Sequence, residues 1–236
     1  QMPKKHRDEP AFAIIGYGKL GGKELGYTSD LDLVYLFDDP DQEAGQTYAR
    51  LSNRLTTWLS GSTAAGTLYD IDLRLRPNGD DGFPVHSTAA FDKYQHENAW
   101  TWEHQSLTRA RFVCGDPDIG RQFEDTRRRI LRLRRDPDTL RREILAMREK
   151  ITAAHPPLPT DIKYARGGIV DVEFIVQYLI LAHAADCPAL MDNTGNIALL
   201  ETAAEHDLID PALAGRARRA YRHYRACQHD TKLRDT

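Results

Sequence analysis

Two acidic residues, two positions apart, open an apolar run in the first third of the chain. Asp30 precedes and Asp32 lies within residues 31–37, whose composition is that of a buried strand. Because side chains alternate along a strand, both carboxylates point to one face, about 6.5 to 7 Å apart along the backbone. Unpaired carboxylates at this spacing repel each other and disfavour folding unless a positive charge lies between them. The pair therefore predicts a strand with a cation site at the end where Asp30 and Asp32 lie.

A second segment supplies a third carboxylate. Residues 67–76 alternate strictly between apolar residues and Asp or Arg. This pattern predicts a strand with one apolar and one charged face, ended by Pro77. If this strand lies beside the first, Asp72 closes the site, with Asp70 on the same face.

Three carboxylates offer only oxygen ligands, which are the ligands that Mg²⁺ prefers together with water and nucleotide phosphates. Two ions held by three carboxylates form the in-line arrangement of phosphoryl transfer, in which one ion activates the attacking hydroxyl and the other steadies the leaving pyrophosphate. We therefore predict Asp30, Asp32 and Asp72 as both metal ligands and catalytic residues, with two Mg²⁺ ions and ATP as substrate.

Glycines and basic residues near the acids fit a bound nucleotide. Gly21 and Gly22 stand before the acidic pair, and their backbone N–H groups can approach phosphate oxygens closely because no side chain intervenes. Lys19, Arg74 and Arg76 can balance the charge of a triphosphate. Each element has a plainer explanation: a glycine cluster as a turn, an Asp-x-Asp pair as a solvated strand end, alternating Asp and Arg as surface ion pairs. Their combination favours catalysis.

The second half of the chain has helical periodicity. Asp116 as N-cap and Pro117 at the first position predict the start of one helix. Helices are predicted over residues 46–59, 117–134, 137–153, 168–185, 193–206 and 211–227. We expect an α+β fold, with a small mixed sheet in a core domain over residues 1–112 and a helical bundle over residues 113–236.

Composition excludes several classes of protein. The net charge of −3 gives no general attraction to nucleic acid or to anionic membranes, and no stretch approaches the ~20 apolar residues of a membrane span. Cys114, Cys187 and Cys227 are too few and too scattered for a disulfide framework or a zinc site. We expect a cytoplasmic protein that is not a nucleic-acid polymerase and does not bind a membrane.

The acidic and glycine motifs resemble those of the DNA polymerase beta-type nucleotidyltransferase superfamily. A closer match is to the glutamine synthetase adenylyltransferase family. The matching segments are residues 16–33 (GYGKLGGKELGYTSDLDL), 69–77 (YDIDLRLRP), 100–105 (WTWEHQ), 109–111 (RAR) and 167–174 (GGIVDVEF). The resemblance implies a polymerase-beta-type core followed by a helical bundle.

This family is bifunctional, and the resemblance is greater to its C-terminal half, which transfers AMP from ATP to a tyrosine of glutamine synthetase. The alternative is the other half, which removes AMP by phosphorolysis and forms ADP. The resemblance implies Asp30 and Asp32 as paired metal ligands, Asp72 as the third carboxylate, and Gly21 and Gly22 in the phosphate loop. Ser29, beside the acidic pair, is included with the nucleotide-binding residues. Glutamine synthetase is the expected partner, with a PII-type signal protein as a further candidate.

Other features are open to several interpretations. Asp70 stands where the family commonly has Glu, which argues against a direct catalytic role, and the loop at residues 78–83 departs from the family pattern. Asp171 is explained by the helix dipole at the start of a helix, and both it and Glu173 are candidates for the active-site cleft. Glu103 is a candidate partner for Arg109 or Arg111.

The arginine-rich segment 121–150 is interpreted first as solvated helix faces, and alternatively as a docking surface or an RNA-binding surface. A non-catalytic module that binds nucleotide or a signal protein is the rival from another functional class. The complete set of three acids argues against that rival, because a binder has no need of a costly anionic cluster.

Overall fold

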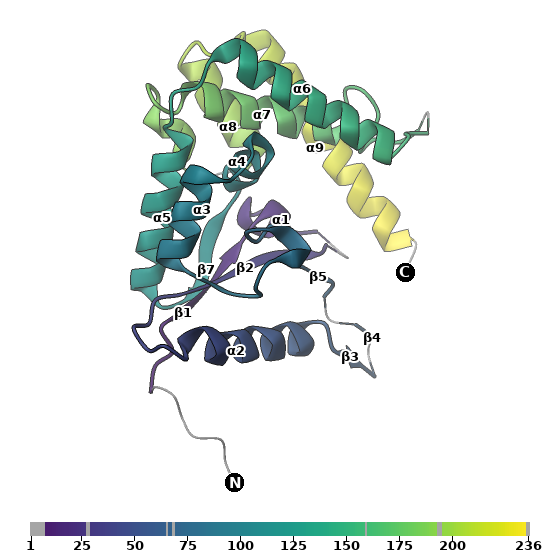
Figure 1. The fold of residues 1–236 in the computed structure, drawn as a ribbon. Helices are drawn as coiled ribbons and strands as arrows, with labels where there is room; N and C mark the ends of the chain where they lie inside the picture. The colour runs from purple at the N-terminus through teal and green to yellow at the C-terminus, as the bar shows by residue number, and fades with distance from the viewer. Residues whose placement is uncertain are drawn as a thin grey trace. The chain divides into compact units, whose positions relative to one another are not determined.

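The computed structural model describes residues 8–26, 29–64, 66–67, 69–158, 160–192 and 195–234. Figure 1 shows the elements. The strands are β1 Phe12–Gly16, β2 Leu31–Phe37, β3 Ser62–Thr63, β4 Gly66–Thr67, β5 Ile71–Asp72, β6 His86–Ser87 and β7 Arg111–Gly115. The helices are α1 Gly18–Gly21, α2 Ala44–Leu59, η1 Gly79–Asp81, α3 Thr88–Glu97, α4 Thr101–Leu107, α5 Pro117–Leu131, α6 Pro137–Ala154, α7 Ile169–His183, η2 Pro188–Met191, α8 Asn196–Glu205 and α9 Pro211–Arg234.

The chain divides into two compact units that alternate along the sequence. The α/β unit consists of Gln1–Gly21, Thr28–Ala99 and Arg109–Arg127. The helical unit consists of Gly22–Tyr27, Trp100–Thr108 and Arg128–Thr236. The mixed α+β character expected from the sequence is confirmed, while the domain boundary between residues 112 and 113 stays a prediction.

The α/β unit is built on a mixed sheet in the order β5-β2-β1-β7, with β6 also paired to β2. β1 lies antiparallel to β2 and to β7, whereas β5 and β6 both lie parallel to β2. Parallel neighbours need a long crossover, and the 16-residue helix α2 lies within the connection that follows β2. The expected strand at residues 31–37 is confirmed, and β1 at Phe12–Gly16 is a further strand of this sheet.

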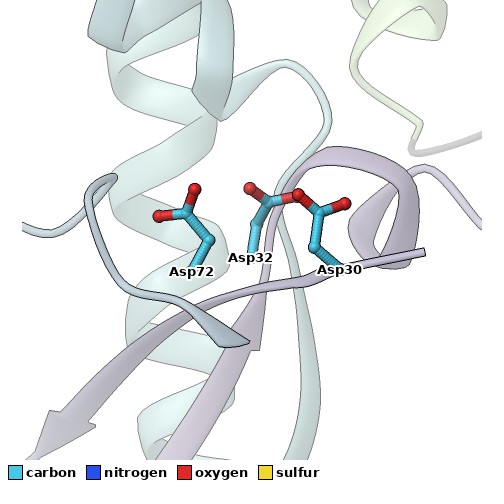
Figure 2. A group of neighbouring side chains, drawn as sticks. All are labelled: Asp30, Asp32 and Asp72. Carbon is cyan, nitrogen blue, oxygen red and sulfur yellow. The ribbon is translucent and has the colours of Figure 1, made fainter. Parts of the chain in front are cut away.

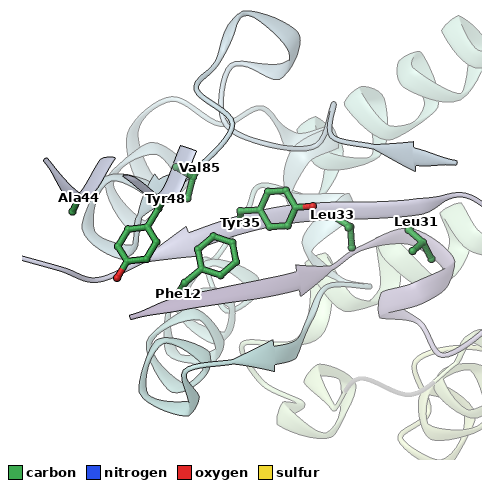
Figure 3. Close-up of a cluster of buried hydrophobic side chains, with 7 residues drawn as sticks. All are labelled: Phe12, Leu31, Leu33, Tyr35, Ala44, Tyr48 and Val85. Carbon is green, nitrogen blue, oxygen red and sulfur yellow. The ribbon is translucent and has the colours of Figure 1, made fainter. Parts of the chain in front are cut away.

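An aromatic and aliphatic cluster fixes α2 to one face of the sheet (Figure 3). The Phe12 ring stacks on those of Tyr35 and Tyr48, with centroids 5.6 and 5.8 Å apart. The cluster comprises Phe12, Leu31, Leu33, Tyr35, Ala44, Tyr48 and Val85. The odd-numbered residues of β2 point into this core, so the even-numbered Asp32 points to the other face.

One predicted strand is wrong in its extent. Residues 67–76 alternate strictly, but the structure has only the two-residue strands β4 and β5 in this region, and Leu68 lies outside the described residues. The backbone N–H of Arg74 donates to Asp72 Oδ1 at 2.8 Å, which turns the chain directly after Asp72. The Asp72 side chain therefore ends the strand, although the alternating pattern predicted that the strand continues to residue 76.

The helical unit confirms most of the expected helices with shifted ends. α6 begins at Pro137 and ends at Ala154, while α9 runs to Arg234, beyond the predicted residue 227. The N-cap prediction for Asp116 is confirmed, because its Oδ1 accepts the N–H of Asp118 at 2.8 Å and α5 begins at Pro117. Asn193, where another helix was expected to begin, lies outside the described residues. Among the described helices, none combines the length and the apolar character that a bilayer crossing requires.

Candidate active site

Three carboxylates converge at one end of the mixed sheet (Figure 2). Asp30 immediately precedes β2, Asp32 is its second residue, and Asp72 is the last residue of β5. The parallel register pairs Asp32 directly with Asp72. One oxygen from each carboxylate lies within 4.8 Å of one from each of the others. The two neighbouring strands thus bring together the three acids that the sequence singled out.

The electrostatics of Asp32 are those of an anion without sufficient positive charge nearby. Burial, reinforced by the carboxylates of Asp30 and Asp72, raises the pKa of Asp32 to about 6, against the opposing effects of Lys19 and Arg109. A cation placed among the three oxygens would remove the main electrostatic cause of this shift. The cluster therefore fits a divalent metal by charge as well as by its all-oxygen donor set.

Arg74 is paired with Asp72, the third carboxylate of the cluster. Its guanidinium donates to both oxygens of Asp72, with Nε 3.1 Å from Oδ1 and 3.0 Å from Oδ2. These hydrogen bonds lower the pKa of Asp72 below its ordinary value. The Arg74 side chain is largely exposed, with 72% of its surface accessible.

The two other cations predicted to bind nucleotide lie in different surroundings. Lys19 Nζ is 3.9 Å from Asp30 Oδ1, which places its charge at the acidic cluster. The Arg76 guanidinium instead donates to the carbonyls of Leu73, at 3.1 Å, and Gly82, at 3.3 Å. Arg76 therefore stabilises the turn after β5 in addition to contributing charge near the site.

A cavity of about 530 Å³ opens beside the acids. It is lined by Asp30, Asp70, Ile71, Asp72, Leu73, Arg74 and Arg76. The volume falls within the range of small-molecule sites. The lining combines carboxylates with the side chains of Arg74 and Arg76, a composition that suits a metal-bound polyphosphate, and Asp70 lies in the wall of this cavity.

The glycine segment approaches the acids more closely than its sequence indicated. Gly18 has φ +51°, and a Cβ there would lie 2.1 Å from Asp32 Oδ2. The backbone N–H of Tyr17 donates to the carbonyl of Asp32 at 2.9 Å. Residue 18 must therefore be glycine both for its backbone conformation and for the space that Asp32 occupies.

Arg111 holds the same segment from β7, a role that the sequence did not specify. Its guanidinium donates to the carbonyls of Leu20, at 3.2 Å, and Gly21, at 3.1 Å. A Cβ on Gly21 would meet the carbonyl of Arg109 at 1.8 Å. The motif of residues 109–111 thus packs against the predicted phosphate loop through backbone contacts, which side-chain patterns in a sequence do not reveal.

The remaining predicted residues lie around this core or in the helical unit. Ser29 is buried at 7% exposure, and Gly22 begins the segment that groups with the helical unit. Glu103 accepts the backbone N–H of Trp100 at 2.8 Å, at the start of α4. Glu173 lies on α7, with Oε1 3.3 Å from the hydroxyl of Tyr221.

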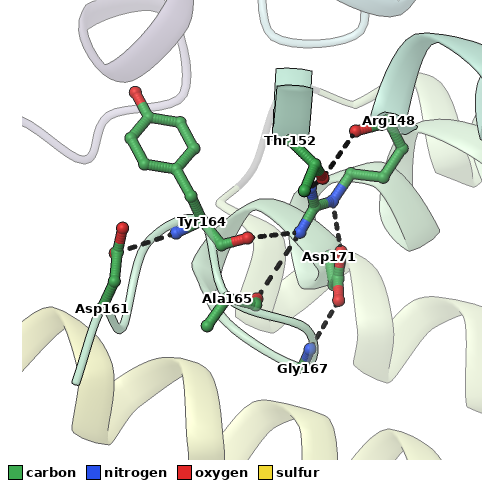
Figure 4. A network of polar contacts seen from close by, with 7 residues as sticks. All are labelled: Arg148, Thr152, Asp161, Tyr164, Ala165, Gly167 and Asp171. Atoms are coloured by element: carbon green, nitrogen blue, oxygen red, sulfur yellow. Dashed lines mark hydrogen bonds and ion pairs between the residues drawn. The ribbon is translucent and has the colours of Figure 1, made fainter. Parts of the chain in front are cut away.

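Asp171 belongs to a network within the helical unit (Figure 4). Its Oδ1 accepts Arg148 Nε at 2.5 Å, and its Oδ2 accepts the backbone N–H of Gly167 at 2.5 Å. Arg148 also donates to the carbonyl of Tyr164 at 2.8 Å. The network joins α6 to the start of α7, in agreement with the helix-start interpretation of Asp171.

Two family models match separate parts of this chain. The model described as Glutamate-ammonia ligase adenylyltransferase matches residues 1–126, and the model described as GlnD PII-uridylyltransferase matches residues 138–236.

Individual relatives share one name, bifunctional glutamine synthetase adenylyltransferase/adenylyl-removing enzyme. That of Neisseria meningitidis serogroup A is 67% identical over 234 residues, which are 99% of this chain and 26% of the relative. The Chromobacterium violaceum protein is 60% identical, with the same two coverages. That of Aromatoleum aromaticum is 56% identical over 97% of this chain and 25% of its own length. The chain thus spans about a quarter of the length of these relatives.

Proposed function

The chain belongs to the glutamate-ammonia ligase adenylyltransferase family, and from this premise we propose that it transfers AMP from ATP to a tyrosine hydroxyl of glutamine synthetase and releases pyrophosphate. The observation that carries the proposal is the register of β2 and β5, which sets Asp32 beside Asp72. The named activity of the relatives supports the choice of AMP as the transferred group. With ATP and glutamine synthetase as substrates, the proposed setting is the cytoplasm.

The proposed core is that of a polymerase-beta-type nucleotidyltransferase. Support comes from the antiparallel strands β1 and β2, which have a glycine-rich segment between them in sequence, and from a third acid on a parallel neighbour of β2. This arrangement places the acids on rigid backbone and the glycines on the loop that faces them. Positioning and charge stabilisation are the main contributions that a protein makes to phosphoryl transfer.

Asp30, Asp32 and Asp72 would hold two Mg²⁺ ions. When bound, the metal would neutralise triphosphate charge and lower the pKa of the attacking hydroxyl. Arg74 would exchange the Asp72 carboxylate for a phosphate oxygen as ATP enters. Because the hydrogen bonds from Arg74 lower the pKa of Asp72, their loss would leave Asp72 more basic and able to accept the tyrosine proton.

Other residues of the site would orient the nucleotide. Lys19 and Arg76 would supply further positive charge next to the triphosphate. Gly22 would offer its backbone N–H group to the phosphate oxygens, whereas the N–H of Gly21 donates to the carbonyl of Tyr17 at 2.8 Å, so Gly21 would contribute by leaving room for them. Ser29, which is buried, would lie next to the acidic pair. Arg111 would keep the loop in place through its bonds to the carbonyls of Leu20 and Gly21.

The test is mass spectrometry of glutamine synthetase after incubation with this chain, ATP and Mg²⁺. The expected product carries one AMP on a tyrosine of each modified subunit, and pyrophosphate accumulates in equal amount. Asp32→Asn should abolish transfer while the circular dichroism spectrum of the chain remains unchanged. AMP incorporation by Asp32→Asn at the unaltered rate would reject the assignment of the site.

The names of the relatives also include an adenylyl-removing activity, so removal of AMP by phosphorolysis, a separate reaction that consumes inorganic phosphate, is a second candidate. Incubation of the chain with adenylylated glutamine synthetase and inorganic phosphate separates the two. Formation of ADP there, without AMP transfer in the forward assay, would assign this chain to the removing activity. Calorimetry that shows ATP binding without turnover in either assay would instead identify a nucleotide-binding regulatory module.

The helical unit suggests the second partner. Residues 138–236 match the family described as GlnD PII-uridylyltransferase. We propose a PII-type signal protein as the regulator that this part of the chain contacts. Binding of purified PII protein to the chain, measured by calorimetry with and without glutamine synthetase, tests this partner directly.

A further inference from the structure

A cavity of about 660 Å³ lies within the helical unit, between α6, α7 and the first turn of α9. Its described lining residues all belong to that unit. The volume falls within the range of small-molecule sites, which commonly lie between the helices of a bundle. The proposed AMP transfer makes no use of this cavity, so its chemistry requires a separate explanation.

One side of α6 forms the first wall. Its lining residues recur every three or four positions, which places them on the same side of a helix: Arg141, Ile144, Leu145, Arg148 and Thr152. At a rise of about 1.5 Å per residue, this wall is about 16 Å long. An extended ligand can therefore lie along it.

α7 forms the second wall, and its sequence is apolar on most sides. Phe174, Ile175 and Tyr178 face the cavity, whereas Val172 and Val176 are buried elsewhere in the unit. A helix that is apolar on most sides is normally buried on most sides. This helix instead leaves an apolar strip uncovered where it borders the cavity.

Large apolar side chains from three helices are exposed at the cavity. Leu145 of α6 is 52% exposed, Ile175 of α7 is 41% exposed and Leu213 of α9 is 45% exposed. A single exposed apolar side chain is common on protein surfaces, but a group of them around one hollow marks a binding site. The lining therefore favours a ligand with an apolar body.

The charges at one end of the cavity are balanced. Arg148 pairs with Asp171, whose second oxygen accepts the backbone N–H of Gly167 (Figure 4). Glu149 follows Arg148 in sequence, and Arg166 precedes Gly167, so two arginines and two acids of the lining lie at this end. This end offers no net attraction to an anion.

Arg141 is the unbalanced charge of the lining. It lies about 10 Å from Arg148 along the axis of α6, at a rise of about 1.5 Å per residue. Its side chain is exposed, and no acid among the described residues forms an ion pair with it. A guanidinium group binds a carboxylate through two parallel hydrogen bonds. The cavity thus combines an apolar wall with one cation at the end away from its acids.

We propose that this cavity binds an apolar monocarboxylic acid, with the carboxylate against Arg141 and the hydrocarbon chain along Leu145 and Ile175. A dicarboxylate is disfavoured, because its second charge would meet the balanced end at Arg148 and Asp171. The inference goes beyond the proposed function and does not depend on it, since no residue of the acidic cluster takes part.

The test uses decanoate and decanol as probes, because the two share a hydrocarbon chain and differ in charge. Calorimetry below the micelle concentration should show one saturable site for decanoate. Decanol should bind about tenfold more weakly, because the charge-assisted hydrogen bonds are lost. Methyl NMR should locate both probes through shifts at Leu145, Ile175 and Leu213.

Three variants separate the charge from the apolar wall. Arg141→Gln should lower the affinity for decanoate about tenfold and leave that for decanol within about twofold. Arg142→Gln is the matched control, because this neighbouring arginine is also exposed but does not line the cavity, and it should match the unaltered chain. Ile175→Gln should weaken both probes by a similar factor, and the chain should stay folded because Ile175 is partly exposed.

Several results would overturn the proposal. These are equal decanoate affinity in Arg141→Gln and the unaltered chain, methyl shifts confined to other parts of the chain, or no saturable binding of decanoate. Broadening of the same methyl signals with rising protein concentration, without either probe, would show that a second copy of the chain covers the cavity instead. None of these measurements involves AMP transfer, so the proposed function stands or fails separately.

Discussion

Asp32 is the central residue of the site, because it is the most enclosed of the three acids and has a carboxylate on either side. Its position on β2 was predictable, since Asp-x-Asp in an apolar run places both acids on one face of a strand. The close approach of Gly18 and the backbone contacts of Arg111 were not predictable. They depend on distances between backbone atoms that no side-chain pattern encodes.

The raised pKa of Asp32 makes the stability of the metal-free chain depend on pH. A carboxyl whose pKa rises on folding contributes stability that is complete below its ordinary value of 3.8 and is lost as the pH rises through about 6. Urea unfolding in EDTA should therefore show decreasing stability across this window, by at most about 3 kcal/mol. Asp32→Asn should remove most of this slope, and saturating Mg²⁺ should reverse the loss at pH 7. An equal slope in Asp32→Asn would contradict the assignment.

Gly18 and Gly45 provide a matched pair of substitutions with opposite expected signs. Gly18→Ala places a methyl group against the Asp32 carboxylate at φ +51° and should cost at least about 1–2 kcal/mol of unfolding free energy. Gly45 lies in α2 with open space around it, so Gly45→Ala should stabilise by about 0.5–1 kcal/mol. Mn²⁺ affinity should fall only in Gly18→Ala. Equal effects of the two changes would show that the close approach is unimportant.

At the scale of elements, the sequence pattern located β2 and most of the predicted helices, and it failed where side chains bond to the backbone. The charged face at residues 67–76 predicted a long strand, yet the Asp72 carboxylate turns the chain at Arg74.

The arginines of segment 121–150 were interpreted as solvated, but Arg127 is 1% exposed. Burial makes the pKa of Arg135 fall to about 10. Its guanidinium donates to the carbonyl of Ile130, near the end of α5, at 2.9 Å. The helical spacing of apolar residues does not show whether an arginine between them caps a helix or faces water.

The contrast between two ion pairs tests this distinction. Arg148 is 11% exposed and joins Asp171 and the carbonyl of Tyr164, so Arg148→Met should cost about 3 kcal/mol by leaving these acceptors unpaired. Arg134 pairs with Asp186 while 76% exposed, so Arg134→Met should leave the unfolding free energy unchanged within error. Chemical denaturation at low and high salt checks both. A loss in Arg134→Met as large as that in Arg148→Met would refute the ranking.

At the scale of the whole molecule, the two units interleave in a way that sequence order conceals. Residues 22–27 stand between two parts of the predicted catalytic motif, yet they group with helices that begin at Thr101 and later. Composition and periodicity describe local sequence, so they assign such a segment to its sequence neighbours. The contacts of Glu24 with Asn196 and Tyr221 show the actual grouping.

Ligand binding should therefore be detectable in defined segments. Mg²⁺ with a non-hydrolysable ATP analogue at 100 times its dissociation constant should stabilise the folded chain by about 2.7 kcal/mol. Hydrogen exchange should slow at residues 16–21, 29–33 and 71–76, whereas α6 serves as an internal reference that stays unchanged. Protection confined to α6 and α7 would indicate that the nucleotide binds elsewhere.

The unequal lengths of two ladders have a kinetic consequence. β2 pairs with β1 through five register positions but with β5 through two. Sheets open first where fewest bonds must break, so Asp72 would detach from a shared ion while Asp32 stays in place. The rate at which β5 separates from β2 would then set the rate of pyrophosphate release. Residues that strengthen the pairing of β5 with β2 would slow each catalytic cycle without altering the chemical step.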